Sequence, residues 1–192
     1  MRRSLLGTVK HLLTLERHSD TGSDVARWSE DSNFHSNWDD RTKDLAALVS
    51  DRQTVIEYGS GPLGAQRFLP ETCGYVGSDL VLRGTGSLAI DLNAKKIPFL
   101  PAADVALFSG VLEYVHDLPR LVERLASSVD EVVCSYAPTE LNPGDREPHG
   151  WVNEYSTDAL VDLFARVGFS VDHQAEWKRQ VLFKFVRSKP TL

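Results

Sequence analysis

The amino-acid sequence predicts an α/β fold: a Rossmann-like, doubly wound and mostly parallel sheet that ends in an antiparallel hairpin, with helices on both faces. Three observations support this prediction. Five short apolar runs have the length of buried strands and alternate with helical or loop patterns. A glycine-rich turn directly follows the first run, as in parallel sheets that bind a ligand there. Two further runs near the C-terminus are separated by a short polar turn, which is typical of a hairpin.

The expected strands are defined by the ends of these apolar runs. They are residues 54–58, 75–78, 88–90, 104–108, 131–136, 169–176 and 180–187. Helices are expected where apolar residues recur every three or four positions, because that spacing places them on one helical face. These segments are 36–50, 118–127 and 157–167, with a shorter helix after Gly64. Residues 80–87 are too few and too rich in glycine for a crossover helix, so an irregular connection is expected there.

Residues 1–35 are expected to form an N-terminal arm or lid, and residues 36–192 a single domain. Leucine and valine residues between positions 5 and 15 could line one face of a short helix. Further along, three large aromatic residues stand in a polar segment: Trp28, Phe34 and Trp38. The simpler interpretation, which we favour here, is that they pin the arm onto the domain. The alternative is a lid, in which these residues or His35 face a ligand cleft.

Composition and charge restrict the class of protein. A chain of 192 residues with 42% hydrophobic and 25% charged residues is typical of one globular domain. The net charge of -6 argues against a broad nucleic-acid surface. No apolar run reaches the ~20 residues of a membrane span, and the start lacks the apolar stretch of a signal peptide. Two cysteines, Cys73 and Cys134, set no disulfide framework, which agrees with a cytoplasmic protein. Together with the charge and the lack of a membrane span, this predicts a protein without nucleic-acid or membrane partners.

The first strand and its turn carry the first functional signal. Residues 55–64 read Val-Ile-Glu-Tyr-Gly-Ser-Gly-Pro-Leu-Gly, so Gly59, Ser60 and Gly61 form the turn that follows Glu57. Glycine permits a sharp turn and lets a ligand lie against the backbone. The amides of such a turn attract polar or anionic groups. The pattern also matches the G-x-G-x-x-G fingerprint of dinucleotide-binding proteins.

Three acids end three successive strands: Glu57, Asp79 and Asp91. Asp79 follows the first glycine of the turn at the spacing with which an acid reaches the hydroxyls of a ribose. Asp91 ends the next strand, where its carboxylate could accept a hydrogen bond from the exocyclic amine of adenine. Leu80 and Leu92 follow these two acids and could pack against the faces of the adenine ring. The sequence therefore predicts an adenosine-containing ligand at one edge of the sheet.

The order and spacing of these motifs resemble those of class I S-adenosylmethionine-dependent methyltransferases. The matching motifs are Glu57-Tyr-Gly-Ser-Gly61, Gly77-Ser-Asp79, Asp91-Leu-Asn, the run from Asp104 to Asp117 that includes Val111-Leu-Glu-Tyr114, and Ala165-Arg-Val-Gly-Phe169. The resemblance covers about residues 38–187. It implies that residues 36–192 form a methyltransferase-like domain, that the chain is an enzyme, and that its cofactor is S-adenosyl-L-methionine.

The resemblance also implies a role for each site residue. The turn at 59–61 would let the methionine part of the cofactor approach, with Glu57 near its amino end. Asp79 would hold the ribose, and the third acid with the leucine after it would meet adenine. Ser109 and Gly110, at the end of the fourth strand, would line the methionine side below the reactive methyl group.

Two features depart from the family pattern, and two alternatives stay open. Pro62 and Leu63 stand where the family often has Thr-Gly, and the connection at 80–87 is unusually short.

An NAD(P)-binding oxidoreductase-like domain uses the same first two motifs, although Asp91 has no obvious function in it. The other alternative is a catalytically inactive methyltransferase-like protein that binds the cofactor or a partner.

The expected reaction is O- or N-methylation of a small molecule, because the acidic net charge disfavours nucleic acid. The protein must align the acceptor with the methyl group and exclude water, and an oxygen acceptor of high pKa also needs a base. Candidate bases are His149, His116, Glu113, Glu140 and Glu154. His149 is the first choice, because the loop that contains it is expected to overhang the cleft.

No metal site is expected, since the acids lie on separate strands, and the oligomeric state is open.

Overall fold

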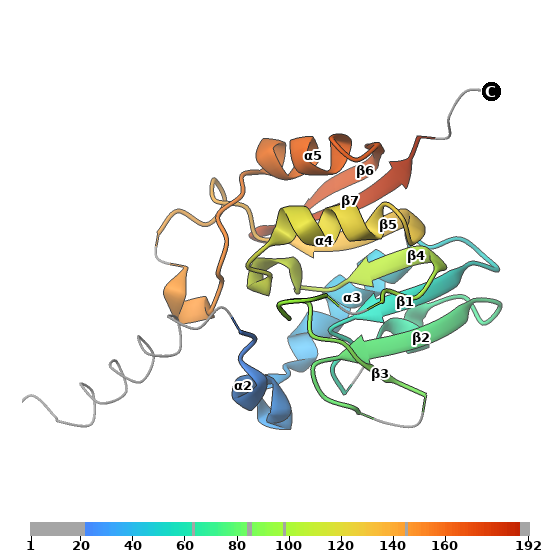
Figure 1. Ribbon diagram of the computed structural model, residues 1–192, viewed down its shortest axis with the longest axis horizontal. Helices are drawn as coiled ribbons and strands as arrows, with labels where there is room; N and C mark the ends of the chain where they lie inside the picture. The colour runs from blue at the N-terminus through green and yellow to red at the C-terminus, as the bar shows by residue number, and fades with distance from the viewer. Residues whose placement is uncertain (1–21, 63, 84–85, 98, 145, 189–192) are drawn as a thin grey trace, which may run out of the picture.

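A computed structural model describes residues 22–62, 64–83, 86–97, 99–144 and 146–188. Within these residues, seven strands form one sheet in the order β3-β2-β1-β4-β5-β7-β6 (Figure 1). The strands are β1 (Thr54–Tyr58), β2 (Gly74–Asp79), β3 (Leu88–Ala89), β4 (Ala103–Phe108), β5 (Val129–Tyr136), β6 (Phe169–Trp177) and β7 (Gln180–Arg187). The helix predicted between residues 5 and 15 lies outside the described residues.

Strand direction confirms the predicted sheet. Strands β1 to β5 pair in parallel, whereas β7 is antiparallel to both β5 and β6. The final hairpin thus folds back with its second strand inside the sheet and its first strand at the edge. At the centre, Tyr58 is level with Ser78 of β2 and Phe108 of β4, so the carboxyl ends of these three strands meet. In open α/β sheets this edge is where ligands bind.

Helices cover both faces of the sheet, as predicted. Helices α4 (Leu118–Leu125) and α5 (Thr157–Ala165) lie on one face, and α3 (Asp39–Ala46) lies on the other (Figure 1). The apolar residues of α4 are fully buried because they recur with helical spacing toward the sheet. Side-chain oxygens of Asp117 and Ser156 cap α4 and α5 by accepting hydrogen bonds from backbone amides in the first turn.

The connections of the β1–β3 half are less regular than expected. The predicted helix at 36–50 is a 3₁₀ turn (Ser36–Trp38) followed by α3. After α3 the backbone tightens, because the amides of Leu48 and Val49 donate hydrogen bonds to the carbonyls of Leu45 and Ala46, three residues earlier. The short helix after Gly64 is a 3₁₀ turn, Ala65–Phe68, and β3 has two residues. In the part of 80–87 that the structure describes there is no helix, as predicted. None of the described helices is both long and apolar enough to cross a membrane.

Candidate cofactor and acceptor site

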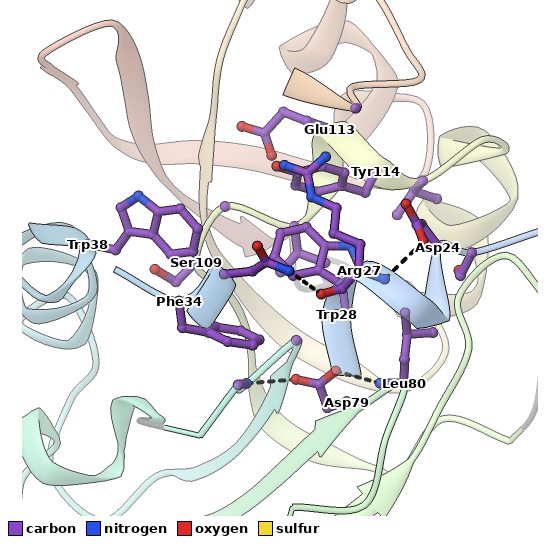
Figure 2. Close-up of a pocket in the computed structure, with 18 of the residues that line it drawn as sticks. Asp24, Arg27, Trp28, Phe34, Trp38, Asp79, Leu80, Ser109, Glu113 and Tyr114 are labelled. Atoms are coloured by element: carbon purple, nitrogen blue, oxygen red, sulfur yellow. Dashed lines mark hydrogen bonds between the residues drawn. The ribbon is translucent and has the colours of Figure 1, made fainter. Parts of the chain in front are cut away.

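A cavity of about 1030 Å³ lies at the carboxyl ends of β1, β2 and β4, next to the N-terminal segment 22–42 (Figure 2). This volume is at the upper end of the range for small-molecule sites. All but one of the residues predicted to bind the cofactor line it: Glu57, Gly59, Ser60, Gly61, Asp79, Leu80, Leu92, Ser109 and Gly110. Asp91 is the exception. Of the candidate bases, His149, His116 and Glu113 line the cavity, whereas Glu140 and Glu154 do not.

The glycine turn is shaped by packing as well as by its backbone. Gly59 and Gly61 have positive φ angles of 69° and 55°, which favour glycine. A Cβ on Gly59 would lie 2.5 Å from Cγ2 of Val111, and one on Gly61 would lie 2.7 Å from Cε1 of Phe34. The sequence attributed these glycines to a ligand, but in the structure two side chains already approach them. Glycine is therefore required here by the protein itself.

Asp79, at the end of β2, joins the first and second strand ends. Its Oδ2 accepts a hydrogen bond from the Gly61 amide at 2.7 Å, and its Oδ1 accepts one from the Leu80 amide at 2.6 Å (Figure 2). Nε of Arg83 lies 3.5 Å from Oδ2. Because a carboxylate oxygen can accept a second hydrogen bond, Asp79 can hold the turn in place and still bind a hydroxyl group.

Glu57, at the end of β1, is buried and also hydrogen-bonded. Its Oε2 accepts hydrogen bonds from the Ala65 amide at 2.7 Å and from the Tyr75 hydroxyl at 2.5 Å. Burial raises the pKa of Glu57 to about 7, and the nearby Asp79 charge adds to the rise, against the lowering effect of these two hydrogen bonds and of Arg67. A positively charged group in the cavity would favour the ionised form.

Asp91 connects the N-terminal segment to the end of β3. Its Oδ1 accepts hydrogen bonds from the Ser23 hydroxyl at 2.7 Å and from the Asn93 amide at 2.9 Å. The side chain of Asn93 then donates to the Tyr114 carbonyl at 2.8 Å. The carboxylate is thus engaged beside the cavity instead of lining it, and its contact with adenine stays a prediction.

The N-terminal segment both packs on the domain and lines the cavity. Helix α2 (Val25–Ser29) begins this segment, and Trp28, Phe34 and Trp38 all reach the cavity (Figure 2). Their ring centroids lie 5.7 Å apart for Trp28 and Phe34, and 6.5 Å apart for Phe34 and Trp38. Arg27 donates a hydrogen bond to the His149 carbonyl at 3.1 Å, which links the segment to the loop after β5. The two interpretations of the arm therefore do not exclude each other.

Arg41 is a site residue that the sequence analysis missed. It projects from α3, is buried, and donates hydrogen bonds to the Ser109 carbonyl at 3.1 Å and to Gln180 at 3.1 Å. Its guanidinium group also lies against Gly110. Because Arg41 precedes Leu45 by four residues, the two share the inward face of the helix, and this spacing could have identified it.

Glu113 and His149, both candidate bases, occupy different depths of the cavity. Glu113 belongs to the 3₁₀ turn Leu112–Tyr114 after β4 and is 1% exposed. Burial raises the pKa of Glu113, while Arg41 and Arg146 oppose the rise. His149 is exposed at the end of the 3₁₀ turn Glu147–His149, and its ring stacks on Trp151 at 4.4 Å between centroids. Its function as a base stays a prediction.

The residues present fit a nucleoside cofactor. The cavity combines two strand-end carboxylates, Glu57 and Asp79, with apolar walls from Leu80 and Leu92. Carboxylates suit ribose hydroxyls and an amino group, while leucine side chains suit the faces of a base. Ser60 of the glycine turn lines the same cavity. The hydrogen-bond acceptors and apolar groups that adenosine and a sulfonium need are thus gathered in one place.

Comparison with known proteins identifies the family. Residues 30–174, more than half of the chain, match a family model described as a methyltransferase domain. No curated protein sequence matches the chain. This match decides against the oxidoreductase-like alternative, because it spans both the shared first motifs and the later ones.

Solved structures share the fold at low sequence identity. The chain superposes on a Burkholderia thailandensis 1,6-didemethyltoxoflavin-N1-methyltransferase with bound S-adenosylhomocysteine at a TM-score of 0.65 and 14% identity, covering 98% of this chain and 93% of that one. A Mesorhizobium loti S-adenosylmethionine-dependent methyltransferase gives a TM-score of 0.63 and 18% identity over 78% and 100%. The pyocyanin biosynthetic protein PhzM gives 0.58 and 14% over 77% of this chain, which spans 54% of PhzM. The chain thus belongs to the methyltransferase domain family, as an S-adenosylmethionine-dependent methyltransferase of class I.

Proposed function

We propose that this chain transfers a methyl group from S-adenosylmethionine to an oxygen or nitrogen atom of a small-molecule acceptor. One observation carries the proposal: a single cavity joins the acids and glycines of the β1 and β2 ends to the aromatic side chains of segment 22–42. The volume of the cavity suits a nucleoside cofactor together with a compact acceptor. The Burkholderia enzyme also holds the small molecule 1,6-didemethyltoxoflavin, which agrees with an acceptor of this size.

In this proposal, the cofactor end of the cavity binds through residues that the sequence already indicated. Asp79 accepts hydrogen bonds from the ribose hydroxyls, and Leu80 and Leu92 pack on adenine. Glu57 attracts the amino end of the methionine part, while Ser109 and Gly110 line its other side. When bound, S-adenosylmethionine supplies an activated methyl group on a positively charged sulfur atom.

The remaining contribution of the protein is alignment and exclusion of water. We infer that residues 1–35 act as an arm that closes the cavity and that residues 36–192 form the methyltransferase domain. Three contacts support this closing function: Phe34 on Gly61, Arg27 with the His149 carbonyl, and Ser23 with Asp91. His149, at the rim, is the first of the candidate bases from the sequence, and Glu113, another of them, lies deeper in the same cavity.

Calorimetry tests the cofactor part of this proposal. The chain should release or absorb heat on titration with S-adenosylmethionine, with micromolar affinity, and give no signal with NAD. Asp79→Ala should lose this binding. Heat with NAD alone would end the proposal. Transfer of labelled methyl to a panel of small acceptors tests the second half, and a chain that binds the cofactor but never forms S-adenosylhomocysteine would contradict it.

A further inference from the structure

Glu113 is the most deeply buried acid among the described residues that line the cavity. Its Oε1 accepts a hydrogen bond from the Ala137 amide at 2.9 Å, which fixes the carboxylate beside the end of β5. Its backbone carbonyl accepts one from the Val152 amide at 2.8 Å, which fixes the turn itself. Its Oε2 is buried but forms no hydrogen bond with any residue that the structure describes. Because a buried unsatisfied acceptor costs free energy, this oxygen is a place for a donor from a ligand.

The two arginines near Glu113 do not donate a hydrogen bond to its Oε2. Arg41 and Arg146 interact electrostatically with the carboxylate from α3 and from the loop after β5. The hydrogen bonds of Arg41 go to Ser109 and Gln180, and Nη1 of Arg146 donates to the Ala137 carbonyl at 2.9 Å. The two arginines therefore stabilise a negative charge on Glu113 and leave Oε2 able to accept a hydrogen bond.

Glu113 also lies at the end of the cavity where methyl transfer is expected. Arg41, whose charge acts on Glu113, packs its guanidinium group against Gly110 and bonds to Ser109. These two residues are proposed to line the cofactor below its methyl group. In Figure 2 Glu113 extends from the 3₁₀ turn after β4 toward the other side chains that line the cavity.

The surrounding aromatic rings indicate what kind of molecule this end accepts. Five tryptophan, phenylalanine and tyrosine rings line the cavity, and they are Trp28, Phe34, Trp38, Tyr114 and Trp151. Each already has a guanidinium group near its face. Arg27 lies 5.0 Å from the Trp28 centroid and 5.9 Å from that of Tyr114, and Arg41 lies 5.7 Å from Trp38. Arg83 lies 4.7 Å from Phe34, and Arg146 lies 4.7 Å from Trp151. A cationic acceptor would compete with these arginines, whereas a flat uncharged ring packs against the free ring edges and faces.

An anionic acceptor is disfavoured for a different reason. Seven of the described lining residues are aspartate or glutamate, and only three are arginine. A carboxylate next to Glu113 would add like charge in a poorly hydrated place. A hydroxyl or N–H group has neither problem, and it supplies the hydrogen that Oε2 lacks.

Resting on the function proposed above, we propose that the acceptor is an uncharged aromatic compound with a hydroxyl or ring N–H group, and that Glu113 Oε2 receives its hydrogen bond and then its proton. The new bond from the acceptor heteroatom to the methyl carbon replaces the bond from that carbon to sulfur, whose electron pair stays on the neutral sulfur. The proton that the acceptor loses passes to Glu113 Oε2 and is released to water afterwards. Burial makes the carboxylate a stronger base, which supports this function.

A matched series of probes tests the acceptor class by binding alone. The full chain is saturated with S-adenosylhomocysteine and titrated with 2-naphthol, 2-methoxynaphthalene, 2-naphthoate and 1-naphthylmethylammonium. We expect 2-naphthol to bind about tenfold more tightly than 2-methoxynaphthalene, which lacks only the donor hydrogen. The absorption of bound 2-naphthol should also shift toward that of the naphtholate. Tighter binding of the carboxylate or the ammonium compound, or no binding of 2-naphthol, would overturn the proposal without any variant.

Glu113→Gln then tests the residue, with Glu123→Gln as the matched control on the exposed side of α4. Glutamine can still accept the Ala137 hydrogen bond, but it presents a donor where Oε2 was. We expect the preference for 2-naphthol to disappear, its absorption shift to be lost, and S-adenosylhomocysteine affinity to stay within about threefold of wild type. Methyl transfer to any accepted phenol should fall about 100-fold in kcat.

The remaining outcomes separate this inference from the proposed function. If Glu113→Gln weakens S-adenosylhomocysteine instead, the carboxylate binds the cofactor and the inference is overturned while the methyltransferase function stands. The same holds if His149→Ala, and not Glu113→Gln, abolishes transfer. If the wild-type chain binds neither S-adenosylmethionine nor S-adenosylhomocysteine, the proposed function fails, and the inference fails with it.

Discussion

The two ends of the cavity use buried carboxylates differently. At the β1 and β2 end, Glu57 and Asp79 accept hydrogen bonds from backbone amides of the segments that follow β1 and β2. At the β4 end, Glu113 accepts one backbone amide and keeps its second oxygen without a partner among the described residues. Substitutions at the first end should therefore change the shape of the site, whereas substitutions at the second should change its chemistry.

The largest effect is expected from Asp79→Ala. Loss of the carboxylate leaves the Gly61 and Leu80 amides without their acceptor, so the turn loses its shape as well as its ribose partner. S-adenosylhomocysteine affinity should fall at least about 100-fold by calorimetry, since hydrogen bonds to a charged group contribute about 1.5–3 kcal/mol each. Asp91→Ala is the matched control beside the cavity and should lose far less. Equal losses would mean that both acids bind the cofactor.

The next largest effect is a pH dependence caused by Glu57. Its pKa of about 7 in the folded chain lies above the ordinary value of 4.5, so its contribution to stability is full below pH 4.5 and is lost as the pH rises through 7. This loss is about 3 kcal/mol in the free energy of unfolding. Urea unfolding of Glu57→Gln between pH 4.5 and 8 should show a correspondingly smaller decline than wild type. An identical decline in both would show that Glu57 does not titrate in this range.

A smaller effect is expected when the turn is crowded. In Gly61→Ala the new Cβ combines a positive φ with a close approach to the Phe34 ring. The free energy of unfolding should fall by about 2 kcal/mol, of which about 1 kcal/mol is the cost of the backbone conformation. Gly168→Ala is the control, because its φ is 90° but nothing lies within 4 Å of the added Cβ. Phe34→Ala should recover part of the Gly61→Ala loss and none of the Gly168→Ala loss.

The smallest effect should come from releasing the arm. Arg27→Ala removes the hydrogen bond to the His149 carbonyl and the packing against Gly150. We expect S-adenosylhomocysteine to dissociate up to about fivefold faster in stopped-flow measurements, because one partly exposed hydrogen bond contributes about 1 kcal/mol. Arg124→Ala, an exposed arginine on α4, should leave the rate unchanged. An unchanged rate in Arg27→Ala would indicate that the arm does not close the cavity.

The sequence predicted the regular half of the molecule best. Strands β4 to β7 and helices α4 and α5 appear close to their expected places, because each has an apolar run or a helical spacing bounded by a cap or a glycine. The helix that became a 3₁₀ turn and a short α3 was less well predicted. Its apolar spacing indicated the buried face correctly, but the tightened hydrogen bonds at its end depend on how the chain turns into β1.

At the site, the sequence by itself determined most of the residues that line one end of the cavity. Gly59, Gly61, Asp79 and the leucines after the acids were identified because glycine turns and strand-end acids are local patterns with fixed spacing. Only the tertiary structure decided that Phe34 lies on Gly61 and that Arg41 is buried beside Gly110. It also decided that Oε2 of Glu113 has no hydrogen-bond partner among the described residues. The reason is physical. Whether a polar atom is buried and hydrogen-bonded depends on contacts between segments that are far apart in the chain, and local sequence patterns do not predict which distant segments come into contact.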